Sequence, residues 1–289
     1  MVNCLCCKKI SNRDIQLCVK KDKNRHQERR AIMLQIGYRI HIRPEWVVPL
    51  VESYGQCFQT MEVKATEKFM KDVYIQSFVA FAKKMGVQKL TFQLPNKVFL
   101  DEAQCAQSCD FMSEMEPNSD VTLNTYYWGD EDQVEDYLHV ISRTAQENSL
   151  TLALENVPVK RNLIAYLKAL KRCAMKHNFR VCLDIGTLFY SAMMDKTSDE
   201  RLFSLFENDP WWNGNVVLVH FHDYNIKGFN LSFGDGYFGK DFKPVKRIMN
   251  CLNANCPIIF KTPVQDFGTQ GIIETKAFLE RMEDFDTKK

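Results

Sequence analysis

The sequence lacks any apolar run of the roughly 18 residues that a membrane-spanning helix needs. The pattern of a secretory signal is missing too, because no apolar segment follows the first charged residues. One-sided charge is absent as well, since 38 Lys and Arg residues nearly balance 36 Asp and Glu residues and leave a net charge of +2. We therefore expect a cytoplasmic protein without membrane or nucleic-acid partners, although Lys20 to Arg30 is locally basic.

Paired cysteine motifs are absent, although the chain contains 11 cysteines. Several lie within apolar runs, where a reduced thiol behaves as a small hydrophobic group: Cys57, Cys173 and Cys182. An N-terminal group could hold zinc or be acylated, but it has only one C-x₂-C spacing, that of Cys4 and Cys7, and not the two paired modules of a strong zinc site: Cys4, Cys6, Cys7 and Cys18. Scattered, unpaired cysteines agree with a reducing cytoplasm.

The chain is long and apolar enough for one large domain. Its 289 residues are 45% hydrophobic and 12% aromatic, which supplies material for a continuous core. A charged segment without hydrophobic periodicity precedes Ala31. We expect an N-terminal extension over residues 1–30 and a single domain over residues 31–289.

After about residue 30, short β-rich runs alternate with longer amphipathic segments, which is typical of repeated βα units. Eight runs are predicted to be strands: Leu34–Ile42, Cys57–Val63, Gln88–Leu94, Val121–Tyr127, Leu150–Glu155, Arg180–Asp184, Asn215–His220 and Pro257–Thr262. Helices are expected between them, including Thr66–Met85, Asp130–Asn148, Asn162–His177 and Asp241–Leu252. The pattern predicts an α/β fold, a single-domain (β/α)₈ TIM barrel.

Three successive strand runs end in an ionisable residue, namely Glu155, Asp184 and His220. In a (β/α)₈ barrel the carboxyl ends of the strands meet at one mouth, so these side chains should converge. Two carboxylates and an imidazole suit Mn²⁺, Mg²⁺, Co²⁺ or Zn²⁺. Taken singly, Glu155 could begin a turn and Asp184 could cap the next helix.

Further residues near these strand ends are candidate substrate contacts. His222 points the same way as His220 along an extended strand, and Asp223 follows it. His222 is either a partner of the ligands, a substrate contact or a histidine in a solvated loop. On or just after the first strand, Tyr38, His41 and Trp46 could line the substrate site, although Tyr38 and Trp46 could equally be packing residues.

Four segments resemble the xylose isomerase-like barrel superfamily, which includes sugar and sugar-phosphate isomerases and epimerases and barrel-type apurinic endonucleases. The segments are Leu152-Ala-Leu-Glu-Asn-Val-Pro158, Val181-Cys-Leu-Asp-Ile-Gly186, Val219-His-Phe-His-Asp223 and Phe233-Gly-Asp-Gly236. The resemblance covers about residues 33 to 283, and its specific motifs begin at Leu150. It implies that Glu155, Asp184 and His220 are metal ligands and that a fourth carboxylate ends strand eight.

The sequence departs from the family pattern at that fourth position. Strand eight reads Pro257-Ile-Ile-Phe-Lys-Thr262, so Lys261 stands where the resemblance implies a glutamate. A lysine removes one ligand and places a cation near the carboxylates that should hold the metal. Thr187 replaces a family histidine, and Gln93-Leu-Pro95 replaces the histidine of the endonucleases.

Three functions remain open on the sequence. The first is a sugar or sugar-phosphate isomerase or epimerase in which a divalent metal polarises the substrate, Glu155 is ligand and base, and Lys261 is the opposing acid or an anion-binding group. The second is a catalytically degenerate barrel in which Lys261 pairs with Glu155 or Asp184 and the mouth binds a small ligand. The third is a scaffold that binds a protein partner through Trp211 and Trp212, which could also be packing residues. A homo-oligomer is left open.

Overall fold

The computed structural model describes residues 36–40, 60–64, 80, 83–84, 87, 89–93, 122–127, 142–143, 146–147, 150–253, 255–261, 277–278 and 280–282. The chain divides into two compact units, Met1–Ile32 and Met33–Lys289, and every described residue belongs to the second. The expected boundary after residue 30 therefore stays a prediction.

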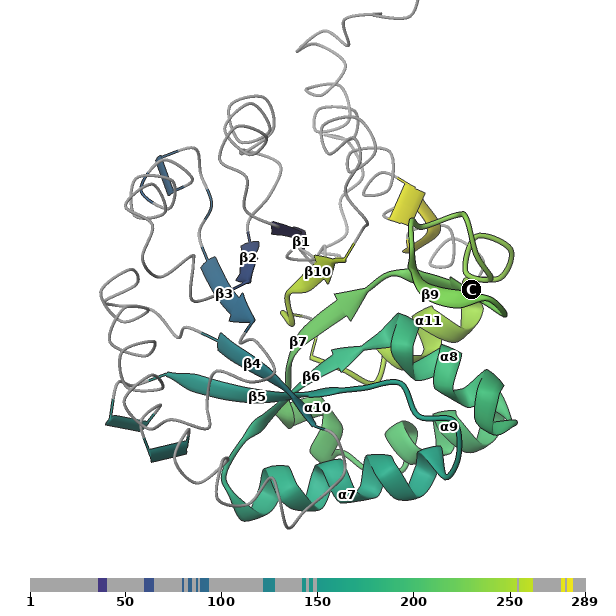
Figure 1. Ribbon diagram of the computed structural model, residues 1–289, viewed down its shortest axis with the longest axis horizontal. Coiled ribbons are helices and arrows are strands. Elements are labelled where there is room, and N and C mark those ends of the chain that lie inside the picture. The colour runs from purple at the N-terminus through teal and green to yellow at the C-terminus, as the bar shows by residue number, and fades with distance from the viewer. Residues whose placement is uncertain are drawn as a thin grey trace, which may run out of the picture. The chain divides into compact units, whose positions relative to one another are not determined.

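Eight parallel strands form a closed barrel in the order β1-β10-β7-β6-β5-β4-β3-β2 (Figure 1). The strands are β1 (Ile36–Ile40), β2 (Thr60–Lys64), β3 (Lys89–Gln93), β4 (Thr122–Tyr127), β5 (Thr151–Asn156), β6 (Arg180–Asp184), β7 (Val216–Phe221) and β10 (Ile258–Phe260). β1 pairs with β2 on one side and with β10 on the other, which closes the ring. The predicted (β/α)₈ barrel is confirmed. Each strand lies within its predicted run or extends beyond the end of that run by one residue.

The described helices lie on the outside of the barrel beside β5, β6 and β7 (Figure 1). They are α7 (Leu163–Lys176), α8 (Ile185–Asp195), α9 (Asp199–Glu207), α10 (Trp211–Asn215) and α11 (Lys243–Met249). α7 buries Leu163, Leu167 and Leu170, whose spacing of three and four residues forms one apolar stripe. The helices expected over Thr66–Met85 and Asp130–Asn148 lie largely outside the described residues.

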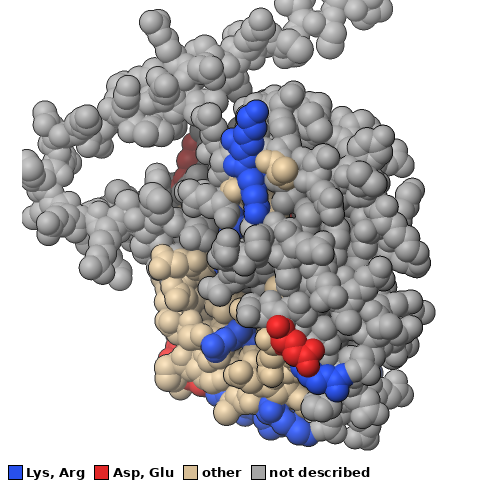
Figure 2. All heavy atoms as spheres, turned by 90° about the vertical axis from the view of Figure 1, so that its left-hand side faces the viewer, with Lys and Arg blue, Asp and Glu red and all other residues tan. Residues whose placement is uncertain are grey.

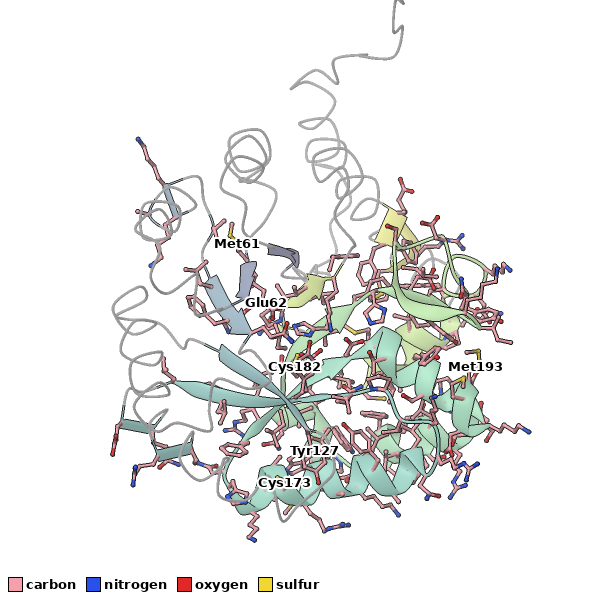
Figure 3. All side chains as sticks on the ribbon, in the orientation of Figure 1. Met61, Glu62, Tyr127, Cys173, Cys182 and Met193 are labelled. Carbon is pink, nitrogen blue, oxygen red and sulfur yellow. The ribbon has the colours of Figure 1, made fainter. Side chains whose placement is uncertain are left out.

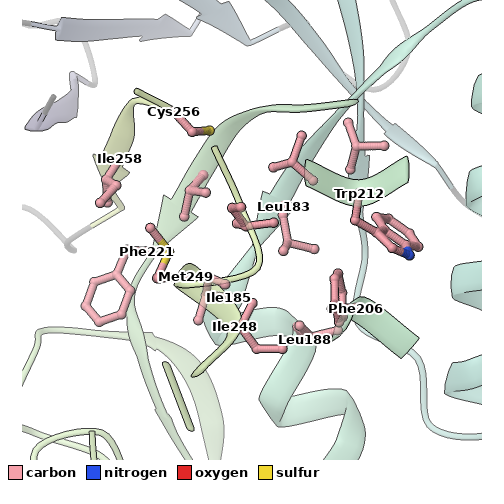
Figure 4. Close-up of a cluster of buried hydrophobic side chains, with 14 of the residues drawn as sticks. Leu183, Ile185, Leu188, Phe206, Trp212, Phe221, Ile248, Met249, Cys256 and Ile258 are labelled. Atoms are coloured by element: carbon pink, nitrogen blue, oxygen red, sulfur yellow. The ribbon is translucent and has the colours of Figure 1, made fainter. Parts of the chain in front are cut away.

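The main hydrophobic core lies between the strands and these helices (Figure 4). Leu183 of β6 and Phe206 of α9 contribute to this core together with Trp212, which is fully buried. The ring of Trp211 lies 5.1 Å from that of Trp212 and packs against the same core. The two tryptophans are therefore packing residues, as one of the two sequence interpretations held.

Side chains inside the barrel form an apolar layer below a polar one. Four of them make a separate small cluster: Ala153, Cys182, Leu218 and Ile259. Two residues further along the same four strand paths come Glu155, Asp184, His220 and Lys261. Because side chains two apart on a strand share a face, this second layer also faces the barrel interior.

A short antiparallel hairpin follows β7 and was not expected from the sequence. Its strands are β8 (Asp223–Asn225) and β9 (Gly228–Leu231), joined by Ile226 and Lys227.

Among the helices that the structure describes, none has the length and apolar character needed to cross a membrane.

Candidate functional site

Lys261 follows β10 and lies between the ends of β5 and β6. Its Nζ donates to Glu155 Oε1 at 2.7 Å and to Asp184 Oδ2 at 2.6 Å. Its backbone N–H bonds Phe221 O at 2.9 Å, which extends the β7–β10 pairing by one residue and fixes the register. The side chain is 8% exposed and both carboxylates are buried, so these charge-assisted bonds are shielded from water.

His220 lies between two carboxylates. Its Nε2 is 2.6 Å from Glu62 Oε2, and its Nδ1 is 3.0 Å from Glu155 Oε1. Glu62 comes from β2, and Figure 3 shows it near the centre of the ring of strands. Sequence reasoning missed Glu62, although it is the only charged residue in the predicted run Cys57–Val63.

Gln93, the last residue of β3, contacts the same glutamate. Its Nε2 donates to Glu155 Oε2 at 2.8 Å, and both side chains are buried. In the sequence this position stands out only because Gln93-Leu-Pro95 replaces the histidine of the barrel-type endonucleases. Glu155 therefore has hydrogen bonds or ion pairs with residues from two strands, β3 and β7, and with Lys261, the residue after β10.

Asp184 is the last residue of β6, caps the N-terminus of α8 and contacts His222. Its Oδ1 accepts from Thr187 N at 2.8 Å and lies 2.8 Å from His222 Nε2. Burial alone would raise the pKa of Asp184, but His222 and Lys261 together hold that pKa well below its usual range. His222 is buried, so the interpretation as a solvated loop histidine is wrong.

Two backbone features hold these groups in place. The Asn156 amide bonds the Asp184 backbone in both directions, donating to its O at 3.1 Å and accepting from its N at 2.7 Å. Gly186 has no room for a side chain, because a Cβ there would lie 2.2 Å from His222 Nδ1 and 2.4 Å from His222 O. The close approach of α8 and the end of β7 therefore requires glycine.

Asp223 organises the glycine-containing loop that follows the hairpin. Its two oxygens accept five backbone N–H groups at 2.8 to 3.2 Å, those of Tyr224, Gly234, Gly236, Phe238 and Gly239. This accounts for much of its hydrogen-bonding capacity. Its expected role in substrate binding stays a prediction. His41 and Trp46 lie outside the described residues, as does the side chain of Tyr38.

A divalent metal needs deprotonated donor groups that are available to bind it. Within the described part of the chain, Glu155, Cys182 and His220 bring ligand atoms within 4.8 Å of one another. Burial raises the pKa of the Cys182 thiol well above its ordinary value, and Glu155 raises it further, which favours the protonated thiol. Both nitrogens of His220 lie against carboxylates, and Lys261 occupies oxygens of Glu155 and Asp184. In this arrangement the residues do not fit a divalent ion.

The outer surface differs from this enclosed layer. Figure 2 shows one outer face, where described Lys and Arg side chains lie near Asp and Glu side chains.

Comparisons with known proteins show the fold at low sequence identity. A D-psicose 3-epimerase solved in the presence of D-fructose is 15% identical, with a TM-score of 0.56 over 85% of this chain and 90% of that one. A sugar phosphate isomerase/epimerase from Parabacteroides distasonis is 12% identical, with a TM-score of 0.57 over 86% and 96%. A xylose isomerase domain containing protein from Salmonella typhimurium is 12% identical, with a TM-score of 0.53 over 86% and 97%.

Protein-family profiles and curated sequences give no match to this chain. The structural likeness nevertheless extends over most of the chain, and it agrees with the resemblance of the four segments from Leu152 to Gly236. The chain therefore shares the (β/α)₈ barrel fold of these solved structures.

Proposed function

We propose that this protein binds a small sugar-like molecule at the carboxyl ends of its strands without a divalent metal. The observation that carries the proposal is the position of Lys261 Nζ, at 2.7 Å from Glu155 and 2.6 Å from Asp184. The ammonium thus takes the place that the family resemblance assigns to a metal ion. The sugar-like ligand is inferred from the fold, which this chain shares with sugar isomerases and epimerases.

Electrostatics supports a resident cation over an exchangeable one. A buried pair of carboxylates needs positive charge nearby, because an isolated ionised group loses its hydration on burial. Lys261 supplies that charge from within the chain and occupies carboxylate oxygens that a metal would need. An ammonium can also donate hydrogen bonds to carbonyl and hydroxyl oxygens, which are the polar groups of a sugar.

A second candidate function retains catalysis, in a sugar or sugar-phosphate isomerase or epimerase. The contact between Glu155 and Lys261 favours it, because a base and an acid then lie side by side. Glu155 would remove a proton beside the substrate carbonyl, and Lys261 would stabilise the oxyanion that develops. Such proton transfer needs Glu155 to exchange its bond with Lys261 for one with the substrate.

Binding measurements in the presence of EDTA test the proposal. The purified protein should contain no stoichiometric Mn, Co or Zn and should bind at least one of D-fructose, D-tagatose and D-fructose 6-phosphate by calorimetry. Lys261→Met should weaken this binding at least tenfold. Lys171→Met is a matched control, because Lys171 pairs with Asp209 elsewhere in the fold and should leave binding unchanged.

Two outcomes would contradict the proposal. One is near-stoichiometric metal that is lost in a Glu155→Ala variant, which would favour the metal-dependent enzyme. The other is failure of all three sugars to bind. Turnover is measured separately, as exchange of solvent deuterium into the bound sugar by NMR, and exchange that disappears in Glu155→Gln would establish the second candidate.

A further inference from the structure

A cleft of about 290 Å³ lies between the turn of the β8–β9 hairpin and the glycine-containing loop that follows it. Its lining includes Ile226 and Lys227 of the turn and Tyr237 and Lys240 of the loop, and we call it the hairpin cleft. Ile226 is 71% exposed and Tyr237 is 38% exposed, whereas most large apolar side chains in the described part of the chain are buried. Exposed apolar side chains gathered at one concave place favour a binding role over scattered exposure.

The two lysines of the hairpin cleft have no acidic partner. Among the residues that the structure describes, neither Lys227 nor Lys240 forms an ion pair, and Lys240 Nζ lies 5.8 Å from the centre of the Tyr237 ring. Asp235 is the one acidic residue among those described in the lining, which leaves an excess of one positive charge. Apolar surface beside two cations suits an acidic peptide segment that carries an aromatic side chain.

The walls of the hairpin cleft are joined to each other before anything binds. Tyr237 N–H donates to Tyr224 O at 2.9 Å, which ties the loop to the first strand of the hairpin. A Cβ at Gly236 would lie 2.3 Å from Tyr224 O, so the loop packs directly on this strand. Asp223 also accepts from the N–H groups of Gly236 and Phe238. A cleft formed in advance reduces the entropy that its occupant must lose.

The last described residues of the chain lie beside the same loop. Arg281 Nη2 donates to Gly239 O at 3.3 Å, and Lys246 Nζ donates to Met282 O at 2.8 Å. Residues 283–286, which lie outside the described residues, read Glu-Asp-Phe-Asp. This short segment therefore has the composition that the hairpin cleft suits, three carboxylates and one aromatic ring.

We propose that residues 283–286 of the same chain dock in the hairpin cleft. Phe285 packs on the apolar side chains, and the carboxylates beside it pair with Lys227 and Lys240. Four extended residues span up to about 14 Å, and Gly239, which Arg281 contacts, is the neighbour of Lys240 in sequence. Because the segment is tethered, its high effective concentration makes weak contacts sufficient.

Docking would connect the chain after Met282 to the hairpin that continues β7. This strand carries His220, and Asp223 at the start of the hairpin follows His222 directly. The segment would thus act as a strap that holds the hairpin beside the polar cluster at the strand ends. The proposal goes beyond the proposed function and does not depend on which ligand that cluster binds.

Zero-length crosslinking of the full chain tests the strap. A carbodiimide joins a carboxylate to an amine only where the two are in contact, and mass spectrometry of the monomeric product locates each link. We expect links from Lys227 or Lys240 to an acidic residue of 283–286. Lys246 is the positive control, because it contacts Met282 O and should link to the same segment. Lys168, exposed on α7, is the negative control and should give no such link.

Two variants test the role of the aromatic side chain. Phe285→Ala removes the apolar contact and should lower the yield of links to Lys227 and Lys240 about tenfold. The yield at Lys246 should stay the same, because the position of Met282 does not depend on Phe285. Thr287→Ala is the matched control in the same segment and should leave every yield unchanged.

Four outcomes would overturn the proposal. Links from Lys246 without links from Lys227 or Lys240 would show that the segment lies elsewhere. Equal yields at Lys168 would show contact without selectivity. Links found only in covalent dimers would assign the hairpin cleft to the segment of a second copy. Unchanged yields in Phe285→Ala would show that the segment is held by its charge alone. None of these results depends on whether the protein binds a sugar.

Discussion

Two clusters in this barrel have the same composition, one cation between two carboxylates, and differ in burial. Lys261 lies between Glu155 and Asp184 and is 8% exposed, while both partners are at most 1% exposed. Arg247 bonds Glu200 at 2.7 Å and Glu207 at 2.5 Å, with its side chain 39% exposed. Water and salt can replace the partners of Arg247 but have little access to those of Lys261.

Because the two clusters differ in burial, their presence has different explanations. A buried ion pair recovers little more than the cost of dehydrating its charges, so stability alone would be served as well by apolar side chains. Stability alone therefore does not explain the Lys261 cluster, which agrees with the binding site proposed above. The Arg247 cluster ties α9 to α11, and its arginine stacks 4.2 Å above the ring of Phe203. It needs no functional explanation.

The largest expected effect is that of Lys261→Met on stability. Removing the ammonium leaves Glu155 and Asp184 buried without their shared counter-charge, which should lower the free energy of unfolding by about 3 to 5 kcal/mol. Urea denaturation measures this change. Adding Asp184→Asn to the variant should recover part of the loss, because it removes one of the uncompensated charges. A loss of stability no larger than that of a surface variant would show that Lys261 is not held as described.

Gly186→Ala should have the next largest effect, because the packing of Gly186 against His222 leaves no space. The new Cβ would lie 2.2 Å from His222 Nδ1, so α8 or the end of β7 must shift. We expect a loss of about 1 to 3 kcal/mol in the free energy of unfolding. Gly214→Ala is the control, since a Cβ at Gly214 would meet nothing within 4 Å. Equal stability of the two variants would contradict the tight contact.

A smaller effect should appear on acidification, through Asp184. Its pKa is held well below the usual value of about 3.9 because His222 and Lys261 outweigh burial. A group with a depressed pKa stabilises the folded state above its unfolded pKa and loses this contribution as the pH falls through its folded pKa. The stability advantage of the wild-type protein over Asp184→Asn should therefore be full near neutral pH and shrink below about pH 4. A difference that stays constant on acidification would argue against an ionised Asp184.

Local patterns in the sequence were sufficient for the fold and for part of the cluster of polar residues at the strand ends. Arg180–Asp184 has the same bounds in the structure as in the prediction, because a short apolar run that ends in a charged residue marks a buried parallel strand well. Glu155, Asp184 and His220 could be found together for the same reason. Their convergence follows from barrel geometry alone.

Contacts between distant strands could not be predicted in the same way. Glu62 meets His220 across 158 positions of sequence, and its run carries no motif that names a partner. In the sequence, Gln93 is notable only because the barrel-type endonucleases have a histidine near this position. Its role as a hydrogen-bond donor depends on where Glu155 lies in the fold. Four of the five bonds to Asp223 exist only because the loop from Gly234 to Gly239 folds back over it. The sequence shows which polar groups are present, but which of them are in contact depends on the folded barrel.

Arg247→Met should change the free energy of unfolding least among these substitutions. Glu200 and Glu207 remain exposed when the guanidinium is removed, so water replaces it, and the methionine keeps apolar contact with Phe203. The free energy of unfolding should stay close to that of the wild-type protein. Raising the salt concentration to about 1 M should remove the remaining difference, because the screening length then falls to about 3 Å. The deficit of Lys261→Met should persist under the same conditions, since ions do not reach its buried carboxylates. If salt instead removes the Lys261→Met deficit and leaves an Arg247→Met deficit, the assignment of one cluster as buried and the other as exposed is wrong.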